Sequence, residues 1–303
     1  MESRGKRLKA LIAAPEILVC PGVYDGFSAR LAAASGFATA VVSGAGVSES
    51  HLGWADRGIM GYAENVQVCR QLAEFCDDEL LLQGDADTGY GNAMNVHFTV
   101  RGFEAAGLAA VMIEDQVWPK RCGHMAGKSV IPADEMVDKV KAAVDARRDA
   151  DFVIKARTDA AGPLGVNAAI DRLNRYAEAG ADVLFADALL SEDDIVAVAR
   201  QTPKPLIVNM GLGLLTRGTT PLIHPRRLQE IGVAMVSYPR LLSTGAVRGM
   251  MNAMDAFQDM LAGDQPVERP DLLCPFTELN ALMGMEKLDA IEARYAADEQ
   301  ERA

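Results

Sequence analysis

The chain repeats one short unit, in which a helical pattern ends in a glycine and continues into an apolar strand. The glycines are Gly36, Gly107, Gly180 and Gly232, and the strands after them are residues 38–42, 110–113, 182–185 and 234–237. A glycine just past a helix stops it in a left-handed conformation, and an apolar strand without alternation is typical of a strand buried on both faces. The repeat therefore predicts a parallel sheet covered by helices.

Further apolar strands lie between these units, at residues 17–19, 80–83, 152–155 and 206–209. Eight strands separated by helices predict an α/β fold, the (β/α)8 TIM-type barrel. A doubly wound open sheet is the alternative, but no G-x-G-x-x-G follows the first strand. We assign residues 1–264 to the barrel and residues 265–303 to a proline-containing linker and a C-terminal helical arm.

Composition limits the cellular compartment and the classes of binding partner that this chain can have. With 303 residues, half of them hydrophobic, the chain can bury a large core, and its net charge of −12 argues against nucleic acid or an anionic membrane as partner. No apolar run approaches the length of a membrane span, and residues 1–14 lack a signal-peptide core. The five cysteines are scattered and suggest no disulfide framework. We expect a cytoplasmic protein with a small-molecule substrate.

Polar residues follow the predicted strands at their carboxyl ends, where barrels of this kind place their active sites. The rim residues are Ser43, Gly44 and Ala45 after the second strand, Asp85 and Asp87 after the third, Glu114 after the fourth, Arg157 after the fifth, Asp187 after the sixth and Asn209 after the seventh. Solvated loop ends are the alternative, but a packed core does not explain so many carboxylates at the ends of apolar strands. We therefore expect one polar site at this rim.

Asp85, Asp87 and Glu114 form the predicted metal site. They are hard oxygen donors without a histidine among them, which suits Mg2+, or Mn2+, and not zinc. Arg157 and the backbone amides of residues 43–46 supply positive charge for a carboxylate. A metal next to an anion clamp fits a reaction that passes through an enolate.

The segment from Lys120 to His124 reads Lys-Arg-Cys-Gly-His and carries the candidate proton donor. Cationic neighbours lower the pKa of a thiol, so Cys122 between Arg121 and His124 can exchange a proton near neutral pH. Glycines at positions 123 and 127 favour a mobile loop that closes over the site. The alternative is a surface loop with a chance cysteine.

These motifs resemble the isocitrate lyase and phosphoenolpyruvate mutase superfamily. The matching segments are residues 21–26, 43–46, 85–91, 114–116, 120–124 and 156–159, and the resemblance runs from about residue 15 to residue 295. It implies a (β/α)8 barrel, Mg2+, and a homotetramer whose C-terminal helix, over residues 276–300, is exchanged between subunits. Asp56 matches an aspartate of the family and is the candidate base.

Within the superfamily the cysteine loop is typical of carbon–carbon lyases of the 2-methylisocitrate and 2,3-dimethylmalate kind, in which a cysteine protonates the departing enolate. The resemblance therefore implies catalytic roles for Cys122, His124, Glu114 and Arg157, and substrate contacts for Gly123 and for the rim residues 43–45, Asp187 and Asn209. Carboxyvinyl-carboxyphosphonate phosphorylmutase also carries this loop, so a phosphonomutase stays open. Oxaloacetate hydrolysis ranks lower because Pro239 follows Tyr238, as in the lyases, and oxaloacetate decarboxylation ranks lower because members with that activity commonly lack the cysteine loop.

The substrate pocket departs from the family pattern at three places. Val41 stands where many of the lyases have a tyrosine, a candidate to handle the proton of the substrate hydroxyl. Asp187 replaces a glutamate, and the turn after Asn209 is longer, loses a carboxylate and gains Arg217. These differences leave the natural substrate open, and they motivate one alternative of another class, a metabolite-binding barrel without catalytic activity.

Overall fold

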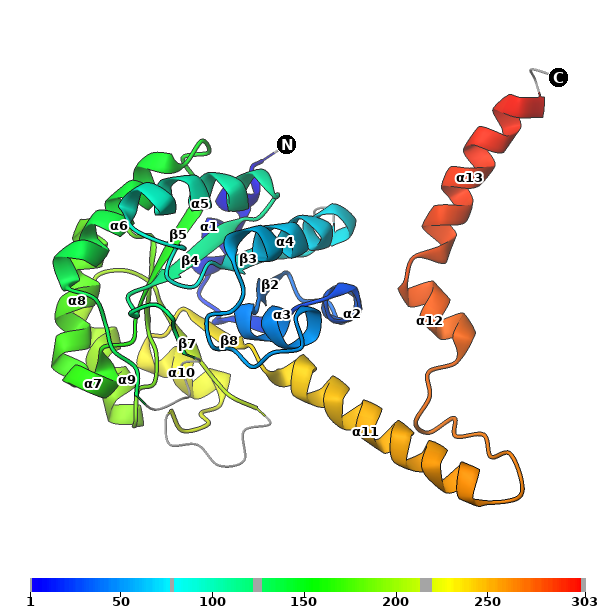
Figure 1. Ribbon diagram of the computed structural model, residues 1–303. Coiled ribbons are helices and arrows are strands. Elements are labelled where there is room, and N and C mark those ends of the chain that lie inside the picture. Colours follow the sequence, from blue (N-terminus) through cyan, green and yellow to red (C-terminus); the bar gives the residue numbers. More distant parts are fainter. Residues whose placement is uncertain (1, 77–78, 122–126, 213–219, 301–303) are drawn as a thin grey trace. The chain divides into compact units, whose positions relative to one another are not determined.

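The computed structural model describes residues 2–76, 79–121, 127–212 and 220–300. Eight parallel strands form a closed barrel in chain order, in which β8 pairs with β1 (Figure 1). The strands are β1 (Leu18–Val23), β2 (Thr39–Val42), β3 (Leu81–Asp85), β4 (Ala110–Glu114), β5 (Val153–Thr158), β6 (Val183–Ala186), β7 (Leu206–Asn209) and β8 (Met235–Tyr238). The predicted (β/α)8 barrel is confirmed, and the open-sheet alternative is wrong because the sheet closes.

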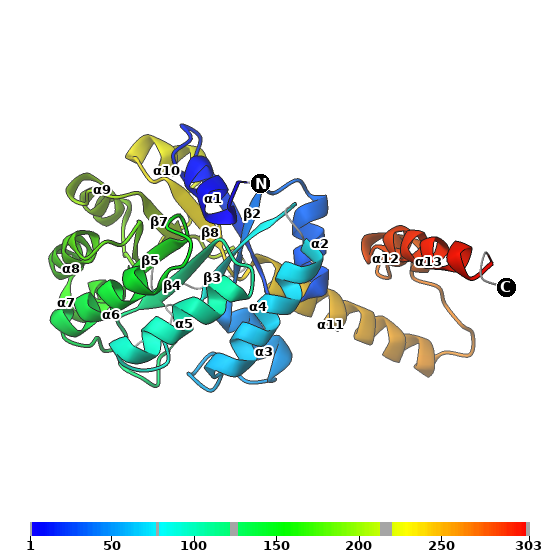
Figure 2. The ribbon, with the colours of Figure 1, turned by 90° about the horizontal axis from the view of Figure 1, so that it is seen from above.

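Helices surround the barrel on its outer face, as the two ribbon views show (Figures 1 and 2). They are α2 (Gly26–Ala34), α3 (Gly44–His51), α4 (Tyr62–Cys76), α5 (Ala93–Ala105), α6 (Ala133–Ala146), α7 (Ala161–Leu164), α8 (Val166–Glu178), α9 (Glu192–Gln201) and α10 (Pro225–Ile231). The four glycines of the sequence repeat have φ values of 79°, 92°, 105° and 100°. Each stops its helix in the left-handed region, as predicted, and turns the chain into the next strand.

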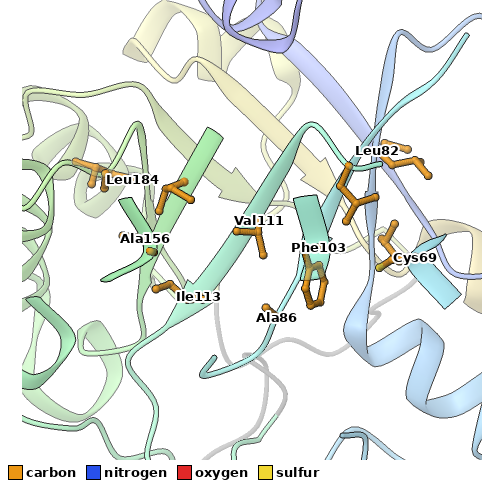
Figure 3. Close-up of a cluster of buried hydrophobic side chains, with 14 of the residues drawn as sticks. Cys69, Leu82, Ala86, Phe103, Val111, Ile113, Ala156 and Leu184 are labelled. Atoms are coloured by element: carbon orange, nitrogen blue, oxygen red, sulfur yellow. The ribbon is translucent and has the colours of Figure 1, made fainter. Parts of the chain in front are cut away.

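The main hydrophobic core lies between the strands and the surrounding helices. Val111 and Ile113 of β4 belong to one buried cluster with Phe103 of α5 and Cys69 of α4 (Figure 3). Gly84 of β3 leaves room for this packing, since a Cβ there would lie 2.5 Å from the Phe103 ring. The strands and helices therefore pack closely against each other on the outward face of the barrel.

A second cluster fills the inside of the barrel at the amino ends of the strands. It includes Cys20, Leu81 and Met235 from the strands together with Leu8 and Ile12 from α1 (Arg4–Ile12). The sequence pattern did not predict α1, a short helix with four basic residues. Because this cluster fills that end of the barrel, a ligand site must lie nearer the carboxyl ends of the strands.

The chain divides into two compact units, residues 1–243 and 244–303. Helix α11 (Leu241–Ala262) begins in the first unit and runs into the second, which also contains α12 (Phe276–Leu282) and α13 (Met285–Gln300). The helical arm is therefore present, and the boundary placed after residue 264 stays a prediction. In the described part of the chain, no helix is long and apolar enough to cross a membrane.

Candidate active site

A cavity of about 650 Å³, part of it open to solvent, lies inside the barrel toward the carboxyl ends of the strands. Its lining includes six of the nine predicted rim residues and the candidate base Asp56. The six are Ser43, Ala45, Asp85, Arg157, Asp187 and Asn209, whereas Gly44, Asp87 and Glu114 are not among the lining residues. The parallel register brings these side chains together from β2, β3, β5, β6 and β7 and the loops that follow. The structure therefore forms one polar site at the predicted edge of the barrel.

Acidic side chains gather around Lys120 at this site. Lys120 Nζ lies 2.7 Å from Asp56 Oδ1 and 2.7 Å from Asp87 Oδ1, and all three side chains are buried. The backbone fixes their neighbours, because Asp87 N donates to Asp85 Oδ1 and Glu114 N donates to the Asp87 carbonyl oxygen. Asp87 has a φ of 48°, a left-handed conformation that turns the chain sharply after β3.

Buried oxygens without hydrogen bonds show that this cluster lacks positive charge. Among the described residues, Asp87 Oδ2 and Glu114 Oε1 are buried and accept no hydrogen bond, whereas Asp87 Oδ1 has Lys120 as its ion-pair partner. Burial raises the pKa of Asp87 to about 7, although Lys120 opposes the shift, and burial raises the pKa of Glu114 well above its usual range, although Arg157 opposes it. A hard divalent cation would satisfy these oxygens, so the donor set fits Mg2+.

The described carboxylates of this cluster do not by themselves complete the coordination of Mg2+. Within the described ranges, no group of three or more His, Cys, Asp or Glu side chains is already placed to hold an ion. Mg2+ commonly keeps several water ligands and contacts only one or two carboxylates. Asp85 as a direct ligand, with Asp87 and Glu114 acting partly through water, is consistent with this arrangement.

The N-terminus of α3 faces the same acidic cluster. Ser43 is the N-cap, and its hydroxyl accepts a hydrogen bond from Gly46 N at 3.2 Å. A Cβ on Gly44 would lie 3.0 Å from Asp85 Oδ2 and 3.4 Å from Asp87 Oδ1, so only a glycine leaves open space here. The free amides of a helix N-terminus attract anions, which makes this turn suitable for a substrate carboxylate.

Arg157 is held by three carboxylates. Its Nε and Nη2 donate to Asp159 at 2.8 and 3.0 Å, Nη2 also donates to Asp187 at 2.7 Å, and Nη1 lies 3.2 Å from Glu114. The guanidinium is therefore rigidly placed at the cavity wall. Most of its donors already have partners, which limits the role in substrate binding that the sequence predicts for it.

The segments flanking residues 122–126 are anchored at the cavity. On one side Lys120 pairs with Asp56 and Asp87; on the other Lys128 Nζ lies 2.6 Å from Asp159 Oδ1. A backbone hydrogen bond from Val117 N to Ser129 O, at 2.9 Å, joins the segment before residue 122 to the segment after residue 126. Cys122, Gly123 and His124 lie outside the described residues, so their predicted roles stay predictions, and Arg217 lies outside them as well.

Two other acidic residues near strand ends have structural roles. Asp25 caps α2 and accepts from Ser28 N at 2.8 Å. Asp115 accepts hydrogen bonds from Thr158, Arg172 and Tyr176 at 2.7 to 2.9 Å, which ties β4 to β5 and α8. An acidic residue after a strand therefore does not by itself indicate a ligand.

Sequence reasoning missed several cavity residues, namely Gln83, Lys120 as an ion-pair partner, Lys155 and Arg240. Lys155 and Gln83 lie within strands that read as apolar, and the signal that could have found them was a polar side chain inside a doubly buried strand. Arg240, beside Pro239, forms an ion pair with Glu49 of α3. Asn209 Oδ1 accepts a hydrogen bond from Ser237 on β8.

Comparison with known proteins agrees with this architecture. The family model described as phosphoenolpyruvate phosphomutase matches residues 8–258. Over 290 residues the chain is 36% identical to 2,3-dimethylmalate lyase of Eubacterium barkeri, covering 96% of this chain and 97% of that protein. It is 37% identical to 2-methylisocitrate lyase of Aeropyrum pernix, with coverages of 98% and 94%. It is 34% identical to chloroplastic carboxyvinyl-carboxyphosphonate phosphorylmutase of Arabidopsis thaliana, with coverages of 96% and 84%.

Solved structures of related enzymes have the same fold as this chain. A crystal structure of 2,3-dimethylmalate lyase has a TM-score of 0.89 and 32% identity, covering 97% of this chain and 96% of that one. Oxaloacetate acetylhydrolase with the inhibitor 3,3-difluorooxalacetate has a TM-score of 0.88 and 32% identity, with coverages of 98% and 97%. Phosphonopyruvate hydrolase with oxalate and Mg2+ has a TM-score of 0.83 and 28% identity, with coverages of 97% and 100%. The chain therefore belongs to the phosphoenolpyruvate phosphomutase family, within the PEP mutase/isocitrate lyase superfamily of enzymes that its motifs predict.

Proposed function

We propose that this protein is a Mg2+-dependent lyase that cleaves a carbon–carbon bond in a 2-hydroxy di- or tricarboxylate of the 2,3-dimethylmalate or 2-methylisocitrate type. The products are pyruvate and a simpler carboxylate. The observation that carries the proposal is the set of buried carboxylate oxygens without hydrogen bonds beside the N-terminus of α3. The full-length similarity to 2,3-dimethylmalate lyase supports the choice of reaction.

The acidic cluster would bind the metal, and the N-terminus of α3 and the cavity wall would bind the substrate. Asp85, with Asp87 and Glu114 partly through water, would hold Mg2+, which when bound supplies Lewis-acid polarisation of the substrate's C2 oxygen. The amides of Ser43, Gly44 and Ala45 would hold the carboxylate of the pyruvate half. Arg157, Asp187 and Asn209 line the wall that would orient the rest of the substrate.

Cleavage needs a base and an acid on this chain. The base removes the C2 hydroxyl proton, the C2–C3 bond breaks as the C2 carbonyl forms, and the electron pair moves to C3 beside the second carboxylate. Asp56 is the candidate base, and its Oδ1 lies 2.7 Å from Lys120 Nζ, which holds the carboxylate in place at the cavity. Cys122, which Arg121 and His124 would activate, is the candidate acid that protonates C3, and Gly123 would let its loop approach the substrate.

Assembly into a homotetramer with an exchanged C-terminal helix is part of the same proposal. The second unit supports it with an apolar row on α11, formed by Val247, Met250, Met254, Phe257 and Leu261, each about half exposed or more. These residues recur at intervals of three and four, which places them on one side of the helix. Such a row commonly marks a surface that packs against another helix.

Turnover of 2-alkylmalates and 2-methylisocitrate, measured by coupled detection of pyruvate, tests the reaction. We expect Mg2+-dependent activity that EDTA removes, and a decrease of about a hundredfold to ten-thousandfold in kcat for Cys122→Ser, the range for loss of a general acid. Cys274→Ser is the matched control, because Cys274 is a free and exposed cysteine of the second unit. Full turnover in EDTA would exclude the metal, and near-native turnover of Cys122→Ser would make that thiol incidental.

A phosphonomutase is the second candidate, favoured by the 34% identity to carboxyvinyl-carboxyphosphonate phosphorylmutase over almost the whole chain. Phosphorus NMR of the protein with a phosphonate substrate would reveal it, and release of oxalate from oxaloacetate would reveal a hydrolase instead. Pyruvate binding without turnover of any of these acids would favour the metabolite-binding barrel. Val41 and the altered loop after Asn209 motivate that outcome.

A further inference from the structure

Lys155 lies on the floor of the cavity, within β5 and two residues before Arg157. Its side chain is 2% exposed, and its Nζ donates to Gln83 Oε1 at 3.1 Å. The Gln83 amide is oriented by Thr39, whose hydroxyl donates to Leu81 O at 2.7 Å and therefore accepts from Gln83 Nε2 at 2.8 Å. This relay fixes the amide oxygen toward Lys155 and holds the ammonium in place.

The partners of Lys155 distinguish it from the other cations of the cavity. Lys120 pairs with Asp56 and Asp87, and Arg157 with Glu114, Asp159 and Asp187. Arg240 pairs with Glu49. Of the described cations that line the cavity, Lys155 is the one without a carboxylate at ion-pair distance. A buried charge usually has such a partner, since an unpaired ammonium loses its hydration without compensation.

The described residues around Lys155 leave two N–H donors of its ammonium available to a ligand. An ammonium has three N–H donors, and the Gln83 oxygen uses one of them. The walls at this level are largely apolar, formed by Val41, Met112, Phe185 and Ile207. Val41 is the register partner of Gln83, so the ammonium lies close to the position where the chain lacks a polar side chain. An oxygen that reaches the floor between these walls would meet Lys155.

We propose that Lys155 contacts the ligand directly, and that its ammonium donates a charge-assisted hydrogen bond to an anionic oxygen of the bound oxo acid. The floor then forms an anion subsite in addition to the amides of α3. The identity of the oxo acid as pyruvate rests on the proposed function, whereas the subsite itself rests on the charge and geometry of the cavity. Burial lowers the pKa of Lys155 to about 8, so the ammonium form still predominates at neutral pH.

Calorimetric titration of oxalate, a small dianion, into the Mg2+-loaded protein tests the subsite. Lys155→Met removes the charge and keeps most of the side-chain length, and we expect oxalate to bind at least about tenfold more weakly, as for loss of a hydrogen bond to a charged group. Mg2+ binding to the metal-free variant should not weaken, because the substitution removes a positive charge near the cation. The opposite responses of the two ligands separate a direct contact from damage to the site.

Lys139→Met is the matched control, because Lys139 is also a buried lysine bonded to a neutral acceptor, Thr88 O at 3.1 Å, and lies outside this cavity. It should keep its oxalate affinity within about twofold, well below the effect of a lost charged hydrogen bond. Lys155→Gln, which keeps a donor for Gln83 without the charge, serves if Lys155→Met does not fold.

Three outcomes would overturn the proposal: unchanged oxalate affinity in Lys155→Met, equal weakening of oxalate and Mg2+, or no oxalate binding to the wild-type protein. Unchanged oxalate affinity would mean that Lys155 only packs within the barrel. Equal weakening of oxalate and Mg2+ would mean that the substitution disturbs the acidic cluster and not a contact with the ligand. Absence of lyase activity would overturn the proposed function alone, since the titration does not depend on turnover.

Discussion

At the residue scale, the site consists of buried charges that are mostly neutralised by one another. Lys120 and Arg157 together face Asp56, Asp87, Glu114, Asp159 and Asp187. The carboxylates outnumber the cations, and burial raises the pKa of Asp87 and of Glu114, whose Oδ2 and Oε1 atoms have no hydrogen bond. The cost of this arrangement in the metal-free protein is the physical reason to expect tight coupling between metal binding and stability.

Lys155 provides a stability prediction whose sign follows from its pKa. Burial lowers this pKa from 10.5 in the unfolded chain to about 8 in the fold, while Asp85 of β3 and Cys20 of β1 act in the opposite direction. Below pH 8 the lysine is charged in both states, and its lowered pKa costs the fold up to about 3 kcal/mol. The cost fades as the pH rises from about 8 to about 10.5.

Lys155→Met should therefore raise the free energy of unfolding of the metal-free protein at pH 7, by up to about 3 kcal/mol less the lost bond to Gln83. The gain should shrink as the pH approaches 10. Urea unfolding at a series of pH values measures both effects. A variant that is less stable than the wild type at pH 7 would show that the bond from Lys155 to Gln83 stabilises the fold by more than burial of the ammonium costs.

The sequence allowed the rim carboxylates to be predicted, because the carboxyl ends of parallel strands meet at one edge. It did not reveal which charges pair with each other, since Lys120 reaches Asp56 and Asp87 only through the folded loop. The position of Lys155 in the cavity was not predicted, because a single lysine within an apolar strand forms no sequence pattern that indicates which face of the strand it occupies. Asp25 and Asp115 follow strands in the same way as Asp85, yet cap a helix and tie β4 to α8.

At the element scale, the strands were predictable to within a few residues because their apolar runs are buried on both faces. Helix α1 was not, since its burial depends on Leu8 and Ile12 meeting the open end of a barrel that forms from distant strands. Glycines within strands show the closeness of this packing. A Cβ on Gly22 of β1 would lie 2.4 Å from the Pro239 Cα, a backbone atom at the end of the neighbouring strand β8.

Gly22→Ala should destabilise the protein by about 1–3 kcal/mol, the usual cost of overpacking, because a backbone atom cannot rotate away. It should also lower activity, since Pro239 and Arg240 line the cavity and would shift with the end of β8. Gly249→Ala is the control: no atom outside its own helix lies within 4 Å of the added Cβ, and alanine favours a helix interior. Equal stability of the two variants in thermal unfolding would contradict the close contact.

At the scale of the whole molecule, the two units differ in how they bury apolar side chains. The barrel unit contains both buried clusters, whose members all precede residue 244. Helix α11 buries only Ser243 among its 22 residues, although its sequence is rich in methionine and leucine. A long helix with an apolar row and no buried face of its own needs a partner surface to be stable in water.

We predict that the row on α11 holds the subunits together. Phe257→Glu places a charge in the middle of the row and should shift the protein from a homotetramer to smaller species, because a buried unpaired carboxylate costs several kcal/mol. Asn252→Glu adds the same charge at an exposed position that the helical spacing places on the opposite side, and it should leave the assembly intact. Light scattering coupled to size-exclusion chromatography measures both masses. Equal masses for the wild type and Phe257→Glu would exclude α11 as the interface, and a monomeric wild type would exclude the tetramer itself.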